Sequence, residues 1–161
     1  MKLLKRIILL VTSHIAVAGL AFSLGIYTLP IIIAPADPSS STLALTIKST
    51  RYVATISDDL TDSDWLHWGE GTFSIGDDYI VFQGKLAPGP AYRLYLSPTF
   101  IETEKDFMHM KSVMVEVGEI NSFANFVLPL NTHIQLDKYT TVVVWCEAFN
   151  QFITAAQFKR L

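Results

Sequence analysis

The chemistry open to this chain centres on its single cysteine, Cys146. One cysteine forms no intramolecular disulfide and cannot cycle as a CxxC dithiol. The remaining chemistries are electron transfer through a bound cofactor and oxidation of the thiol to a sulfenic acid or a mixed disulfide. The alternative is structural, because free cysteines are among the most deeply buried residues and usually behave as small apolar groups.

Redox work or ligation by Cys146 requires a thiolate, which an imidazole, a positive neighbour, a helix N-terminus or a metal stabilises. Glu147 follows directly and would disfavour a thiolate if it faced the same way. Adjacent residues of a strand point to opposite faces, so we expect the Glu147 carboxylate to lie away from the sulfur.

His67 is the candidate partner of Cys146, because an imidazole can activate a thiol or supply a second axial ligand to a bound group. The alternative for His67 is a loop histidine that bonds a backbone carbonyl. Glu70 either orients His67 or faces water. Trp65 and Trp68 either line a cofactor pocket or belong to the core.

A second group of soft donors lies at Phe107 to Met110, where His109 is flanked by two methionines, with Met114 nearby. Thioether and imidazole groups are copper ligands, so a copper site is the functional interpretation, and no metal site is the prediction we adopt. His133 is expected in a solvated turn. His14 lies in an apolar run and is expected to bond locally or to a neighbouring helix.

Short apolar or alternating segments separated by turns follow residue 50, which is typical of strands. We expect strands at 52–56, 71–75, 79–86, 92–96, 112–117, 123–128, 140–146 and 152–158, and one weak helix at 101–110. Gly76 to Asp78 predicts a hairpin turn. The β-branched segment 140–146 is expected to be covered on both faces. The fold class is therefore all-β, an antiparallel β-sandwich or barrel-like domain at residues 51–161.

The N-terminal residues 1–34 predict one membrane anchor. Ile7 to Ile33 contains no Asp, Glu, Lys or Arg, and at about 1.5 Å per residue it exceeds the ~30 Å hydrocarbon core. Pro30 predicts that the regular helix ends near Leu29. Residues 35–50, rich in Pro and Ser at their start, are expected to be a linker.

Charge predicts which side of the membrane the domain occupies. Lys2, Lys5 and Arg6 precede the apolar run and Asp37 is the first charge after it, so the domain is expected outside the cytoplasm, periplasmic or extracellular. The alternative is a cleaved signal peptide with an A-x-A site at Ala34 to Ala36, which places the domain on the same side. The apolar run is longer than a signal core and favours the retained anchor.

The exported part carries nine Lys or Arg against fifteen Asp or Glu, a formal net charge of −6. Nucleic acids and anionic lipid heads bind basic faces, so this balance argues against both as partners. The chain also lacks the P-loop, GxGxxG, HExxH and GxSxG motifs, which leaves no recognisable catalytic motif.

Four segments together resemble the DM-thirteen domain, a family often found beside DOMON domains in cell-surface proteins and proposed to transfer electrons. They are Leu66 to Thr72, Gly89 to Pro98, Val117 to Phe126 and Tyr139 to Phe158, in order from about Asp59. The resemblance implies a β-rich domain whose signature cysteine corresponds to Cys146, acting as a thiol or as the ligand of a prosthetic group such as haem. With one cysteine, a haem would take Cys146 as axial thiolate and not be held by a CxxCH attachment.

Two functions of different classes follow from these observations. The first is an exported, membrane-anchored redox module in which Cys146 is the thiol or the ligand and His67 assists, acting with a redox partner protein that the sequence does not identify. The second is a binding or structural β-domain with Cys146 in its core. Hydrolysis by a Cys146 nucleophile with His67 ranks last, because no sequence feature favours it.

Overall fold

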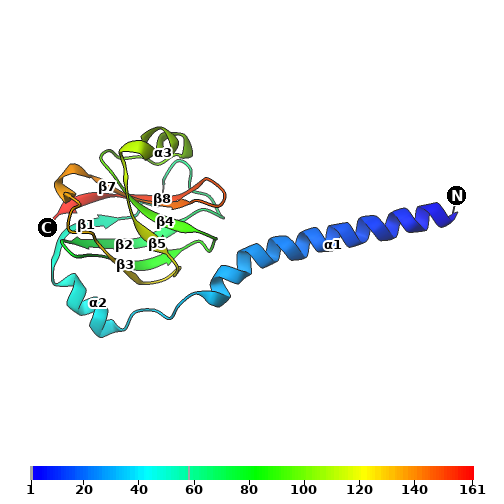
Figure 1. Ribbon diagram of the computed structural model, residues 1–161, viewed down its shortest axis with the longest axis horizontal. Coiled ribbons are helices and arrows are strands. Elements are labelled where there is room, and N and C mark those ends of the chain that lie inside the picture. The colour runs from blue at the N-terminus through cyan, green and yellow to red at the C-terminus, as the bar shows by residue number, and fades with distance from the viewer. Residues whose placement is uncertain (1, 58) are drawn as a thin grey trace.

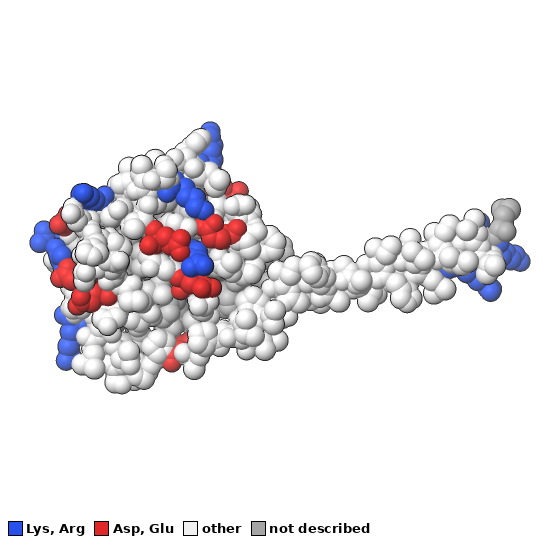
Figure 2. All heavy atoms as spheres, in the orientation of Figure 1, with Lys and Arg blue, Asp and Glu red and all other residues white. Residues whose placement is uncertain are grey.

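The computed structural model describes residues 2–57 and 59–161 and consists of one long helix followed by a β-domain (Figure 1). Helix α1 (Lys2–Ile33) projects from the domain, and the N-terminus lies at its far end. None of its residues is buried, and Figure 2 shows charged side chains only at its N-terminal end. By length and composition α1 can cross a membrane, and these properties agree with a retained anchor and with a signal segment.

Eight strands form one antiparallel sheet in the order β5-β4-β7-β8-β1-β2-β3-β6. Their bounds are β1 Thr50–Thr55, β2 Gly69–Gly76, β3 Tyr79–Leu86, β4 Tyr92–Ser97, β5 Val115–Ile120, β6 Phe126–Pro129, β7 Thr141–Cys146 and β8 Gln151–Arg160. The long strand β8 pairs with β7 over its first part and with β1 over its last, and the edge strands β5 and β6 approach each other. The sheet is a nearly closed barrel, so the expected all-β class is confirmed.

The core fills the inside of this barrel and continues under helix α3 (Glu104–Met110). All six residues of β7 are buried, which confirms the expectation that this segment is covered on both faces. Phe107 of α3 stacks on Trp145 of β7, with ring centroids 3.9 Å apart and planes 8° from parallel. Thr103 caps the helix by accepting from the Asp106 amide, so α3 begins later than the expected residue 101.

Two strands begin three residues later than the sequence predicted. The strand expected at 112–117 starts at Val115, because Lys111–Val113 form the 3-10 turn η1 that continues α3. The strand expected from residue 123 starts at Phe126. A further 3-10 turn, η2 (Leu136–Lys138), precedes β7. Alternation of side chains alone does not separate a strand from a tight turn of similar length.

Helix α1 continues past Pro30 to Ile33, so the predicted end near Leu29 is wrong. Proline removes one hydrogen bond from the ladder, and the turn after it retains helical geometry, as apolar helices often allow. Part of the expected linker is also helical, since α2 (Ser40–Ile47) is capped by the Ser39 side chain. Leu43 is its only buried residue.

Candidate functional site

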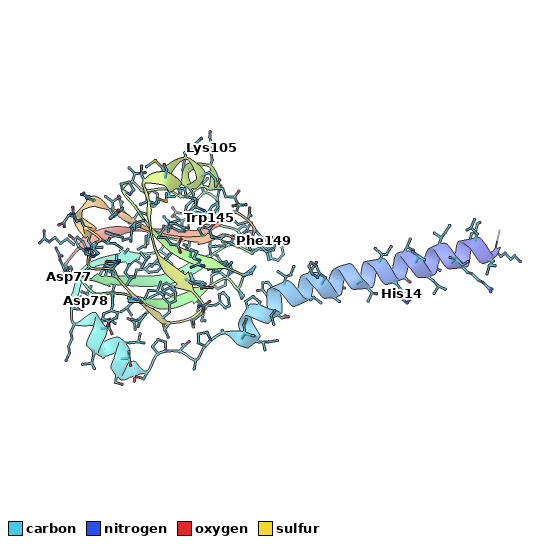
Figure 3. The ribbon with its side chains drawn as sticks, viewed as in Figure 1. His14, Asp77, Asp78, Lys105, Trp145 and Phe149 are labelled. Atoms are coloured by element: carbon cyan, nitrogen blue, oxygen red, sulfur yellow. The ribbon has the colours of Figure 1, made fainter. Side chains whose placement is uncertain are left out.

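A cavity of about 200 Å³ lies at the end of the domain where α1 arrives, and both Cys146 and His67 line it. Its walls come from segments distant in sequence: the loop at residues 63–68, the Pro-Gly-Pro loop at residues 88–90, the turn after β7, and Ser23 to Tyr27 of α1. Figure 3 shows Phe149 at this end of the domain, facing α1. The fold therefore brings together the two residues that the sequence singled out.

Cys146 is the last residue of β7 and only 2% of it is exposed. Its thiol donates a hydrogen bond to the Pro90 carbonyl, with sulfur and oxygen 3.1 Å apart. This contact follows from strand register, because β4 pairs with β7 so that Tyr92 lies opposite Cys146. The chain just before β4 therefore passes beside the sulfur. The Glu147 amide also donates to the Ala91 carbonyl at 3.0 Å and joins the two loops.

The electrostatics around Cys146 favour the neutral thiol. Burial raises the pKa of the thiol above its ordinary value of 9.0. The backbone N–H groups of Ala148 and Phe149 act in the opposite direction, and the Glu147 charge adds to the rise. At neutral pH the sulfur therefore keeps its proton, although two amide donors are in place to bond a thiolate.

Glu147 turns away from the cavity, as the alternation of side chains predicted. Its carboxylate accepts hydrogen bonds from Lys111 Nζ at 2.8 and 2.9 Å and from the Tyr95 hydroxyl. Burial opposes ionisation, but these two donors and the Lys111 charge outweigh it, and the pKa of Glu147 is lowered. The carboxylate beside Cys146 is thus ionised and paired on the opposite face of the strand.

His67 is held by Asp64, a residue that the sequence interpretation missed. The Asp64 carboxylate accepts from His67 Nδ1 at 3.2 Å and from the backbone amides of Leu66 and His67 at 2.7 Å. Burial opposes ionisation of the Asp64 carboxylate, but the hydrogen bonds from Leu66 and His67 outweigh it, so the pKa of Asp64 is lowered. Glu70, the residue considered for this role, is exposed and its nearest cation is Lys85 at 3.9 Å.

The spacing of Asp64 and His67 could have revealed this pair. An Asp commonly accepts the backbone amides of the two or three residues that follow it, and Asp64 lies between the strands expected at 52–56 and 71–75. The structure describes every residue of the loop at 57–68 except Asp58.

The two tryptophans do not line the cavity. Trp65 is 83% exposed, and Trp68 is partly buried but is not among the residues that line the cavity. Two residues that the sequence interpretation did not select, Gly89 and Tyr92, do line it. The buried Tyr92 ring packs against Gly89 and meets Phe123 edge-on, with centroids 5.7 Å apart. The only sequence signal for this wall was the Pro-Gly-Pro turn.

The methionine and histidine group near α3 does not form a ligand set. Met108 and His109 are exposed on α3, whereas Met110 and Met114 pack against the core. Within residues 2–57 and 59–161, no three His, Cys, Asp or Glu side chains are placed to hold a metal ion. His133 is exposed in its turn, as expected.

Haem is the prosthetic group that the resemblance implied, and the site suits it only in part. A thiol with two backbone amides beside it and an imidazole are suitable axial ligands. Pockets that enclose drug-sized ligands have volumes of ~300–1,000 Å³. A haem ring is at least as large as such a ligand, whereas this cavity has a volume of only about 200 Å³. In this arrangement the residues therefore do not fit haem.

Comparison with known proteins assigns the domain to a family. No curated protein and no solved structure matches the chain significantly. The family model described as Electron transfer DM13 matches residues 60–158, which includes His67, the Pro-Gly-Pro loop and Cys146. This match covers more than half of the chain and indicates an electron-transfer-related module. The chain belongs to the electron transfer DM13 family.

Proposed function

We propose that this protein is a membrane-anchored, extracytoplasmic redox module in which the Cys146 thiol is the redox group and His67 assists it. The observation that supports this most directly is the shared cavity, which gives a nearly buried sulfur a neighbouring space and an imidazole. Family membership supports electron transfer as the class of function. The charge-free run Ile7 to Ile33 of α1 supports the anchor, and the positive residues in the first turns of the helix support the orientation.

The cavity favours chemistry at the thiol over a large bound cofactor. Cys146 attacks as a thiolate, so its proton must leave to a base first. His67 is suited to this because Asp64 bonds Nδ1, and among the described residues no hydrogen bond engages Nε2. Attack on a disulfide of a partner protein forms a mixed disulfide and releases one partner thiolate. A dithiol of a second partner protein then attacks the Cys146 sulfur with one thiol and releases the other thiol of the first partner. The remaining thiol of the second partner displaces Cys146, so the first partner's disulfide is reduced, the dithiol is oxidised, and Cys146 returns to its thiol form.

The test uses the full chain in detergent, as isolated. Its absorption spectrum is recorded, and Cys146 is titrated with a disulfide reagent in the native and the unfolded state. We expect no visible band, slow mixed-disulfide formation in the native state, and a slower reaction still in H67A. The E70A variant is the matched control, since Glu70 is exposed and lies outside the cavity wall. A native thiol that never reacts, or reacts equally in H67A and wild type, would sink the proposal.

A second function has its own supporting observation. The thiol is 2% exposed and donates to Pro90, which is how an inert structural cysteine behaves. In this second function the domain is a binding or structural module at the membrane. Cys146→Ser then lowers only the free energy of unfolding, by about 1–3 kcal/mol. A Ser variant that keeps wild-type stability but loses mixed-disulfide formation and the associated redox phenotype supports the redox module instead.

A further inference from the structure

Large apolar side chains stand exposed at the end of the domain that α1 approaches. Trp65 is 83% exposed, Phe149 53% and Leu66 39%. They come from two separate loops, residues 63–68 and the turn after β7, and both loops contribute to the cavity that contains Cys146. Figure 3 shows Phe149 at the edge of the domain facing α1, with Asp77 and Asp78 at the opposite end.

The depth of these loops relative to a bilayer follows from α1. The charge-free run starts at Ile7, and about 20 helical residues span a ~30 Å hydrocarbon core, which places its outer boundary near Ile26. Ile26 and Tyr27 line the same cavity as Leu66 and Phe149. The two loops therefore lie at the level of the outer boundary.

The next part of α1 shows which way the domain extends from that boundary. Leu29, Pro30 and Ile33 line a second groove, together with Gly89 to Ala91, the end of β5 and the segment after it. The helix therefore runs alongside the domain beyond the boundary, and the cavity end is the part of the domain closest to the membrane. An anchor of this geometry brings the exposed side chains to the headgroup region.

The charges at this end permit contact with lipid. The Pro-Gly-Pro loop has no charged side chain, and the charges that flank the exposed residues are engaged, Asp64 by His67 and its own loop and Glu147 by Lys111. On the face in view in Figure 2, the surface where α1 meets the domain is uncharged. The domain is acidic, so attraction to anionic lipids does not supply the contact, and apolar insertion does.

We propose that Trp65, Leu66 and Phe149 insert into the outer interface of the bilayer that α1 spans and dock the domain on it. Tryptophan concentrates at this level of the membrane because its large apolar ring carries one polar N–H group, and the apolar Leu66 and Phe149 add buried area. The inference rests on the anchoring role of α1 given under the proposed function. Docking places the mouth of the cavity among the lipid headgroups, so a partner of Cys146 approaches along the membrane surface.

The test measures tryptophan emission from the full chain in phosphatidylcholine vesicles, with and without lipids brominated near the top of the acyl chains. Bromine quenches on contact, and an inserted side chain reaches roughly 5–10 Å into the headgroup and acyl boundary. The emission of Trp65 is the difference between wild type and W65F. The matched control is W65F/Y79W, since Tyr79 is 44% exposed and follows Asp78 at the opposite end.

We expect brominated lipid to remove about half of the Trp65 emission, to leave the Tyr79→Trp emission unchanged, and to shield Trp65 from aqueous iodide. Quenching of Trp65 no greater than that of the control overturns the proposal. So does a Trp65 shielded from both bromine and iodide, because another protein surface then covers it. Alkaline extraction of the vesicles tests anchoring separately, since a chain that washes off fails the proposed function before docking is in question.

Discussion

The Asp64 carboxylate bonds His67 Nδ1 at 3.2 Å and closes the loop that carries the imidazole to the cavity. A carboxylate only accepts, so the proton of this bond sits on Nδ1, and the tautomer with its single proton there has Nε2 as its acceptor nitrogen. Asp64 is thus the residue that orients the candidate base, although it does not itself line the cavity.

We predict that D64A frees the imidazole and the loop, whereas E70A does not. In the variant the amides of Leu66 and His67 lose their acceptor, so their hydrogen exchange should accelerate several-fold. Nitrogen NMR should show the His67 tautomer shift away from a single Nδ1–H form. Unchanged exchange in D64A, or an equal effect in E70A, would show that another group orients the ring.

Cys146 should react as a buried neutral thiol. Because burial raises its pKa above 9.0, alkylation by iodoacetamide at pH 7–8 should be slower in the native than in the unfolded chain. The native rate should rise with pH through an inflection above 9.0. C146S is the control for reaction elsewhere. An inflection below that value would mean that the Ala148 and Phe149 amides outweigh burial.

The same pKa shift predicts how stability depends on pH. The unfolded thiol loses its proton at a lower pH than the folded one, so the contribution of Cys146 is fully present below the unfolded pKa. It is lost as pH rises from the unfolded toward the folded pKa. Denaturant midpoints between pH 7 and 10 should therefore fall more steeply in wild type than in C146A, and identical slopes would contradict the shift.

Gly89 should tolerate no side chain, because a Cβ there would overlap the Tyr92 ring, whose Cζ lies 2.7 Å from the ideal position. We expect G89A to cost about 1–3 kcal/mol in the free energy of unfolding. The displaced Pro90 carbonyl should also speed alkylation of Cys146. G118A is the matched control, since nothing lies within 4 Å of its Cβ. Equal stability of the two variants would disprove the close packing.

Thr154 is buried, and among the described residues its hydroxyl has no hydrogen-bond partner. Replacing it with the nearly isosteric valine should raise the free energy of unfolding by about 1 kcal/mol, because an unsatisfied buried hydroxyl is lost. Thr141 is equally buried but bonds the Thr140 hydroxyl at 3.2 Å, so T141V should lower stability by about 0.5–1.5 kcal/mol. Thermal denaturation of both variants measures the contrast, and a loss in T154V would point to a bound water.

Sequence patterns predicted the parts of the fold that depend on neighbouring residues. The β-branched run at β7 indicated a strand buried on both faces, and Gly76 to Asp78 indicated the β2–β3 hairpin. Both signals are local, since a strand has a period of two and a turn needs particular residues. Where two local structures share a pattern, as at the start of β5 after η1, the boundary was wrong by three residues.

By itself the sequence determined an N-terminal helix with a long charge-free run, an antiparallel β-domain, a solitary cysteine at the end of its most apolar strand, and the family of that domain. Tertiary structure alone decided what surrounds the sulfur. Strand order places β4 beside β7 and so carries Pro90 to Cys146, and the fold brings His67 and the end of α1 to the same cavity. Such contacts join residues tens of positions apart, and no local period encodes them.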